Sequence, residues 1–317
     1  MATKKSKVVI DSPSGSPPEL IVVSKSIEAP HAEEAESAAK SKSKPSANTL
    51  AGFVVGKKLQ LVPLFADTDA EVAELVSKAS QEEDAEDLSK MRQFYKLAAP
   101  EGEDLESIAA SLNELDEVDG AYVKPGCLPP VYFGDDGMEA APSDDAPPIA
   151  QNLTNTQGYL NAAPQGVDAR YAWTLPGGRG SGVRIIDIEG GWNFGHEDLR
   201  ANVGGLVGGN NNTSDLRWYN HGTAVFGEMT GDRNSFGVTG ICPSANVSAY
   251  SIFGVGSANA IRRAADSLRA GDLMLIELHR GGPNYPGGNT QMGYIAIEWW
   301  PDDLAALQYA TNKGIIV

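Results

Sequence analysis

The sequence is poor in cysteine and contains no long uninterrupted hydrophobic run. Cys127 and Cys242 are the only two cysteines in 317 residues, and neither belongs to a pair with metal-ligand spacing. A disulfide framework or a cysteine-based zinc site is therefore not indicated. A chain of this length can bury a large core without cross-links, so we expect one large domain and one smaller domain.

The amino-terminal residues lack the pattern of a secretory signal. Lys4, Lys5 and Lys7 are not followed by an apolar run of signal-peptide length, because Asp11 and a segment rich in proline and serine intervene. No other segment has the roughly 20 consecutive apolar residues that a transmembrane helix needs. The sequence thus shows neither feature, and the compartment of the protein stays unknown.

Positively charged side chains are also scarce. The chain has 25 lysines and arginines against 42 acidic residues, which gives a formal net charge of −17 at pH 7. Nucleic acids and anionic membrane surfaces would repel such a protein. The composition therefore predicts neither nucleic acid nor membrane as a partner.

Composition divides the first 160 residues into three parts. Residues 1–48 are rich in serine, lysine, proline and glutamate with almost no aromatic residues, which predicts a disordered tail. Residues 49–125 alternate strand and helix patterns and predict a small α+β domain of the split βαβ kind. Residues 126–160 are rich in proline, lack periodicity and predict a linker.

Within residues 49–125, five elements are expected. A capping box at Thr68 predicts a helix with Val72, Leu75 and Val76 on one face. Apolar residues at helical spacing predict a second helix over residues 105–115. The strands are expected at residues 59–65, 94–97 and 121–123.

Residues 161–317 alternate between strand and helix patterns of the length found in parallel βαβ units. Helices are expected at residues 257–270 and 302–312, and strands at residues 183–188, 247–253, 273–278 and from 314 onward. The fold class predicted for the chain is α/β, with a parallel sheet flanked by helices and preceded by the small α+β domain.

Asp187 and His221 are the first candidates for chemistry. Asp187 is an acid near the carboxyl end of the apolar run Val183–Ile188, where open α/β sheets bind ligands. His221 follows 34 residues later and is followed by Gly222 and Thr223. A buried carboxylate that orients an imidazole is two thirds of a nucleophilic triad. The pair therefore predicts general-base catalysis and lacks a nucleophile.

At these residues the sequence resembles a known family, the subtilisin-like serine peptidases, or subtilases. The segment VRIIDIEGGWNFGHEDL is similar to the family's aspartate motif, with Asp187 as its acid. The segment that begins HGTAVFGEM resembles the histidine motif, with His221 as its base. The resemblance covers about residues 160–317 and implies the amino-terminal part of a subtilase catalytic domain.

The resemblance also implies a substrate-binding strand. The residues that match it are Leu278, His279, Arg280, Gly281 and Gly282. Two of them, His279 and Arg280, depart from the small and apolar residues usual there, so the pocket preference cannot be read from them. Ile188 and Glu189 depart as well, because the family usually has serine or threonine and then glycine after its aspartate.

The family's oxyanion asparagine and nucleophilic serine have no counterpart in residues 160–317, where no serine stands in a G-T-S context. The resemblance implies that both lie beyond Val317, so that the 317 residues alone are a fragment expected to be inactive. It also implies that residues 49–125 act as an intramolecular propeptide, with a processing site between about residues 126 and 145.

Three functions are therefore considered. The first is a serine endopeptidase that acts on polypeptide substrates, and the second is a binding or scaffold module that has lost this activity. The third, metal-dependent hydrolysis through Asp187, His196 and His221, is disfavoured because no H-E-x-x-H or comparable spacing exists. No metal site is predicted and no cofactor is required. The resemblance leaves Ca²⁺ open, with Asp215 and residues 210–212 as the nearest candidate.

Overall fold

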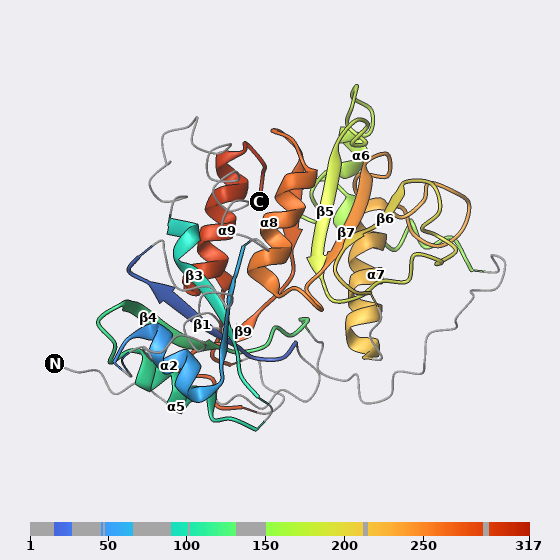
Figure 1. The fold of residues 1–317 in the computed structure, drawn as a ribbon. Helices are drawn as coiled ribbons and strands as arrows, with labels where there is room; N and C mark the ends of the chain where they lie inside the picture. The colour runs from blue at the N-terminus through green and yellow to red at the C-terminus, as the bar shows by residue number, and fades with distance from the viewer. Residues whose placement is uncertain are drawn as a thin grey trace. The chain divides into compact units, whose positions relative to one another are not determined.

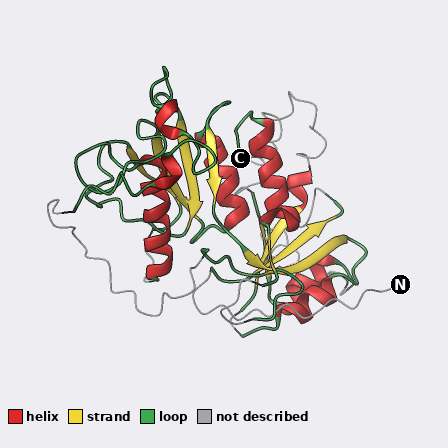
Figure 2. Ribbon diagram, turned by 180° about the vertical axis from the view of Figure 1, so that it is seen from behind, coloured by secondary structure: helices red, strands yellow, loops and turns green. Residues whose placement is uncertain are grey.

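A computed structural model describes residues 16–26, 46, 48–65, 90–100, 102–130, 150–211, 215–287 and 292–317. The chain divides into two compact units, each with its own sheet (Figures 1 and 2). The first unit consists of Met1–Cys127 together with Arg280–Asn312, and the second of Leu128–His279 together with Lys313–Val317. None of the helices in these ranges combines the length and the apolarity of a membrane span.

The first unit is built on a four-stranded sheet in which all neighbours are antiparallel. Its strand order is β2 (Gln60–Pro63), β3 (Phe94–Ala98), β1 (Glu19–Ser24), β4 (Val118–Lys124). Side chains of α2 (Leu50–Lys57) and α5 (Leu105–Leu112) share one apolar core with this sheet. The remaining elements are η1 (Lys90–Gln93), β9 (Arg280–Gly281), β10 (Tyr294–Ile295), η3 (Ile297–Trp299) and α9 (Pro301–Asn312).

The strand β1 corrects the expectation that residues 1–48 form a disordered tail. It lies in the middle of the sheet, where Leu20 pairs with Leu97 on β3 and with Val123 on β4. Leu20, Ile21 and Val22 are almost completely buried, so both faces of this central strand are covered. The six residues of β1 do not show in the average composition of a polar segment eight times as long.

The other expectations for this unit have mixed outcomes. The helix expected over residues 105–115 is present as α5, with the Asp104 side chain accepting a hydrogen bond from the Ser107 amide at 3.3 Å. The helix expected after Thr68 lies outside the described residues, and so do residues 131–149 of the expected linker.

Residues 280–312 group with the first unit, which differs from the boundary expected at residues 161–317. Within this unit, the Tyr122 hydroxyl donates to Asp302 at 3.0 Å, and the Tyr122 ring lies 5.9 Å from that of Trp300. Lys124 forms ion pairs with Asp302 and Asp303, and all three side chains are fully buried. Aromatic and ionic contacts thus join the start of α9 to β4.

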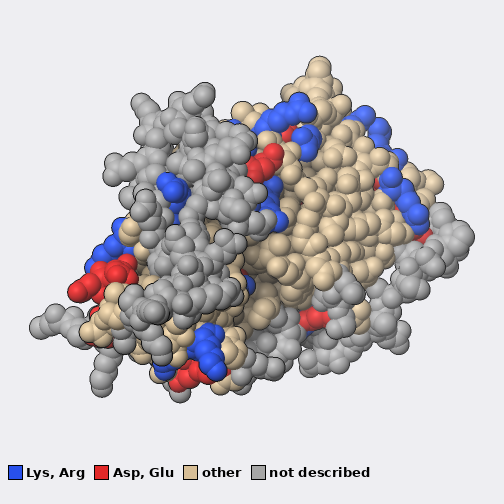
Figure 3. Space-filling view, in the orientation of Figure 1, with Lys and Arg blue, Asp and Glu red and all other residues tan. Residues whose placement is uncertain are grey.

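The second unit contains a parallel sheet flanked by helices, as the sequence predicts. The strand order is β6 (Val203–Gly208), β7 (Asn246–Ser251), β5 (Arg184–Glu189), β8 (Leu273–Ile276), and all neighbours are parallel. The helices are η2 (Gly158–Leu160), α6 (Ala169–Ala172), α7 (Leu216–Thr230) and α8 (Ser257–Ser267). The edge strand β6 was not among the strands expected from the sequence, because its glycines weaken the strand pattern. In Figure 3 a broad face of this unit carries few charged side chains.

Candidate active site

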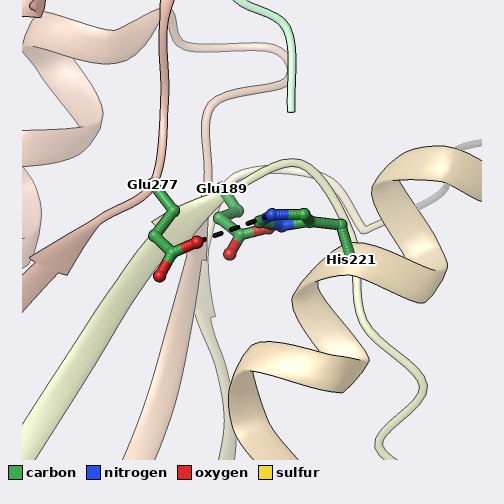
Figure 4. A group of neighbouring side chains, drawn as sticks. All are labelled: Glu189, His221 and Glu277. Carbon is green, nitrogen blue, oxygen red and sulfur yellow. Dashed lines mark hydrogen bonds and ion pairs between the residues drawn. The ribbon is translucent and has the colours of Figure 1, made fainter. Parts of the chain in front are cut away.

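His221 and Glu189 form the centre of the site. The Nδ1 atom of His221 lies 2.8 Å from Oε2 of Glu189, whose side chain is fully buried (Figure 4). Glu189 is the last residue of β5, and His221 lies in the second turn of α7. A carboxylate that accepts from Nδ1–H fixes the imidazole tautomer and leaves Nε2 available as a base.

Asp187 does not make the contact that was expected of it. Its Oδ2 atom accepts a hydrogen bond from the indole Nε1–H of Trp192 at 2.8 Å, while Oδ1 has no hydrogen-bond partner among the described residues. Side chains on a strand alternate between faces, so Asp187 and Glu189 point to the same side of β5. Asp187 lies two residues before the end of β5, and Glu189, at the end of the strand, is the acid beside His221.

Glu277 is a third acid at this site, and the sequence analysis did not single it out. It follows β8 directly, and the parallel pairing of Ile188 with Ile276 brings the ends of β5 and β8 together. Its Oε2 atom lies 3.5 Å from Nε2 of His221, and Glu189, His221 and Glu277 each place a ligand atom within 4.8 Å of the others. The signal that could have identified Glu277 as a site residue is its position directly after a strand of the parallel sheet.

A glycine allows α7 to approach β5 closely enough for these contacts. A Cβ atom on Gly222 would lie 2.4 Å from the carbonyl oxygen of Gly191 and 2.7 Å from the Trp192 indole. The helix begins at Leu216, and Asp215 caps it by accepting from the Arg217 amide at 3.0 Å. The small residue after His221 is therefore a requirement of packing.

Burial and the charge of a neighbouring acid raise the pKa values of the two buried acids, Asp187 and Glu189. Burial raises the pKa of Asp187 well above its usual range, the Glu189 charge adds to the rise, and the Trp192 hydrogen bond opposes it. Burial and Glu277 likewise raise the pKa of Glu189. Burial lowers the pKa of His221, while Glu277 and Asp187 oppose this.

The five residues expected to bind substrate fall into both units. In the second unit, Leu278 is buried, and the backbone of His279 pairs with Leu128 in an antiparallel bridge. Burial lowers the pKa of His279 to about 4, and the nearby His221 adds to this.

The other three expected residues belong to the first unit. Arg280 is buried, donates to the carbonyl oxygen of Pro125 and lies 3.5 Å from a carboxylate oxygen of Asp303. Gly281 pairs with Tyr294 in the β9–β10 ladder. A Cβ atom on Gly282 would lie 2.8 Å from the side chain of Ile295. Structural packing accounts for these positions in the first unit.

One group of side chains in the described ranges has the spacing of metal ligands. Glu189, His221 and Glu277 can each offer one ligand atom, and these atoms lie within 4.8 Å of one another. The set considered from sequence was Asp187, His196 and His221. His196 lies in a loop, where its Nδ1 accepts from the Asp198 amide at 3.2 Å. Only His221 is shared between the two sets.

No protein-family model matches the chain. Among solved structures, the epidermin leader peptide processing serine protease EpiP from Staphylococcus aureus superposes with a TM-score of 0.45 at 14% identity, covering 94% of this chain and 59% of that chain. The nisin leader peptidase NisP from Lactococcus lactis superposes with a TM-score of 0.37 at 23% identity, covering 53% of this chain and 50% of that chain.

A subtilisin from Bacillus sp. (strain TA39) is 33% identical over 192 residues, which cover 57% of this chain and 43% of that protein. The chain is thus similar in sequence to subtilisin-like serine peptidases. An intracellular serine protease from Paenibacillus polymyxa is 32% identical over 110 residues, or 31% of this chain and 32% of that protein. The chain thus spans less than half the length of either subtilase relative.

The subtilase motif also accounts for the position of Glu189. In that motif a glycine stands two residues after the acid, and Gly191 stands two residues after Glu189. Counting from Asp187 instead places Glu189 where the glycine belongs. The glycine spacing was therefore the signal that could have identified Glu189 from the sequence.

Proposed function

We propose that this chain carries the acid–base pair of a serine endopeptidase, with Glu189 in the role of the orienting acid and His221 as the general base. The observation that carries the proposal is the 2.8 Å contact between His221 Nδ1 and Glu189 Oε2. With Nδ1–H held by the carboxylate, Nε2 takes the proton of a serine hydroxyl as that oxygen attacks the peptide carbonyl. The same nitrogen then returns the proton to the leaving amine.

The proposal places the nucleophilic serine and the oxyanion asparagine in sequence beyond Val317. Within the described ranges, the hydrogen-bond and ion-pair partners of His221 are Glu189 and Glu277, both carboxylates. No serine of residues 160–317 stands in the family's G-T-S context. On this proposal the 317-residue chain alone does not hydrolyse peptides.

We further propose that the small α+β domain is an intramolecular propeptide. Its support is the bridge between Leu128 and His279, in which the Leu128 amide donates to the His279 carbonyl at 3.1 Å. His279 is part of the strand that the family resemblance assigns to substrate, and an extended peptide adds to such a strand through backbone hydrogen bonds. Residues just after the α+β domain would thus occupy the place of substrate until the linker is cut.

The test uses the product of the complete reading frame that encodes this chain. We expect a fluorophosphonate serine probe to label it after cleavage in the linker, and His221→Ala to abolish labelling. Glu197→Gln is the control variant and should be labelled like the parent protein. Intact-mass analysis locates the cleavage site. Labelling that is unaffected by His221→Ala would overturn the peptidase proposal, and an active, uncut chain would overturn the propeptide proposal.

The second candidate is a binding module without peptidase activity. Glu277 favours it, because its carboxylate lies 3.5 Å from Nε2, the atom that must accept the serine proton. The same experiment separates the two functions. Absence of labelling, together with saturable binding of extended peptides, supports the binding module.

A further inference from the structure

We propose that His221 and Glu277 form a binding site for Zn²⁺, and that Glu189 supports the histidine through its contact with Nδ1. The site goes beyond the proposed peptidase activity, in which these residues bind no metal.

The first step is the separation of the two ligand atoms. Nε2 of His221 and Oε2 of Glu277 are 3.5 Å apart. Tetrahedral Zn²⁺ with bonds of about 2.0–2.1 Å to nitrogen and oxygen holds neighbouring ligand atoms about 3.3 Å apart. The two side chains therefore already have the spacing of one edge of a zinc tetrahedron.

The second step is the orientation of the imidazole. Nδ1 of His221 lies 2.8 Å from the Glu189 carboxylate, and with this carboxylate as acceptor the lone pair of the neutral ring is on Nε2 and faces Glu277 (Figure 4). Histidines that bind metal characteristically donate their other ring N–H to a carboxylate, which fixes the tautomer and raises the basicity of the ligand. Glu189 supplies this carboxylate.

The third step concerns two buried carboxylate oxygens near the ligand atoms that lack a hydrogen-bond partner. Oε1 of Glu189 and Oδ1 of Asp187 have no hydrogen-bond partner in the described ranges, although both side chains are fully buried. Glu189 and Glu277 both lie beside the single imidazole of His221, at 2.8 Å and 3.5 Å. The other oxygen of Glu189 and of Asp187 is hydrogen-bonded, but a buried oxygen without a partner is costly, so a dication at this point is favoured.

The fourth step is access. The Glu277 side chain is 37% exposed and that of His221 is 16% exposed, so the ligand edge is open to solvent. Water can therefore supply the remaining positions of the tetrahedron. The nitrogen ligand selects zinc over Ca²⁺ and Mg²⁺, which prefer oxygen.

Zinc at Nε2 removes the lone pair that a general base needs. If the proposed peptidase activity exists, Zn²⁺ inhibits it reversibly, and a chelator restores it. This consequence rests on the proposed function, whereas zinc binding itself does not.

The test is calorimetric titration of the metal-free 317-residue chain with ZnCl₂. We expect one site, with His221→Ala and Glu277→Gln each weakening binding at least about tenfold. Glu189→Gln should weaken binding by about 10–100-fold, as loss of a supporting carboxylate does. His196→Ala and Glu197→Gln are the matched controls and should leave the affinity unchanged.

Nitrogen chemical shifts of the imidazole supply a second measurement that does not depend on any variant. Zinc should shift the Nε2 resonance of His221, while Nδ1 keeps its proton. Three results would each overturn the proposal. The Nε2 shift could stay unchanged on addition of zinc, the Glu277→Gln variant could bind zinc as tightly as the parent chain, or Ca²⁺ could bind as tightly as Zn²⁺. Zinc binding in a protein that never labels with fluorophosphonate would leave the site standing and count against the peptidase alone.

Discussion

Asp187 and Glu189 project from the same face of β5, and only Glu189 contacts His221. The Glu189 carboxylate lies at the end of the strand, 2.8 Å from Nδ1, whereas the Asp187 carboxylate is held by the Trp192 indole. Because Asp187 is fully buried among other acids, its pKa is raised, which favours the neutral form. The two acids thus have different tasks, since one orients the imidazole and the other anchors the residue that packs beside α7.

This difference predicts opposite results for two isosteric substitutions in the product of the complete reading frame. Glu189→Gln should lower kcat by about 10⁴-fold, because the amide can favour the wrong imidazole tautomer. Asp187→Asn should lower it less than about tenfold, because the amide oxygen can still accept from Trp192. Steady-state hydrolysis of a peptide substrate measures both. A large loss for Asp187→Asn with little change for Glu189→Gln would return the orienting role to Asp187.

The architecture was predictable where the pattern is regular. Alternating strands and helices over residues 161–317 predicted the parallel sheet, because βαβ periodicity is a property of each segment by itself. The strand β1 was not predictable from composition, since its burial comes from β3 and β4, which follow it by about 70 and 100 residues. Partners that distant leave no local signal.

The candidate site was predictable in part for the same reason. The sequence singled out His221 and the strand β5, whereas the acid expected beside the imidazole was Asp187, two residues before Glu189, which makes the contact. Which of two acids on one strand face reaches the imidazole depends on how far α7 extends over the strand end, and that distance is set by Gly222. Glu277 enters the site only through the register between β5 and β8.

Two glycines on α7 provide a matched test of that packing. Gly222→Ala should destabilise the chain by about 1–3 kcal/mol or more, because its Cβ would lie 2.4 Å from a backbone oxygen. Gly227→Ala should stabilise it by about 0.5–1 kcal/mol, because the nearest atom is at 3.9 Å and alanine is the better helix former. Urea unfolding followed by tryptophan fluorescence measures both changes. Equal effects of the two substitutions would contradict the close approach at Gly222.

The buried ion cluster of the first unit predicts a large effect of one lysine and a small effect of another. Lys124→Met should cost about 3–5 kcal/mol, because it leaves the buried Asp302 and Asp303 without this cation. Lys96→Met is the control and should cost less than about 1 kcal/mol, since Lys96 is 43% exposed in its pair with Glu19.

Adding Asp302→Leu to Lys124→Met should recover part of the lost stability, because an apolar pair replaces an unpaired buried charge. Denaturant midpoints of the three variants measure the effects. Similar midpoints for the two lysine variants would show that the buried cluster contributes no more than a surface pair.

The reactivity of Cys127 reports on the burial of the same region. Burial raises the pKa of its thiol to about 12, and Arg280 opposes the rise only in part. Since the thiolate is the reactive form, the folded chain should leave Cys127 unmodified by iodoacetamide at pH 8. A Cys242→Ala variant, in which Cys127 is the only cysteine, makes the mass reading unambiguous. Modification should appear on addition of denaturant, and modification at the same rate without denaturant would contradict the burial of this side chain.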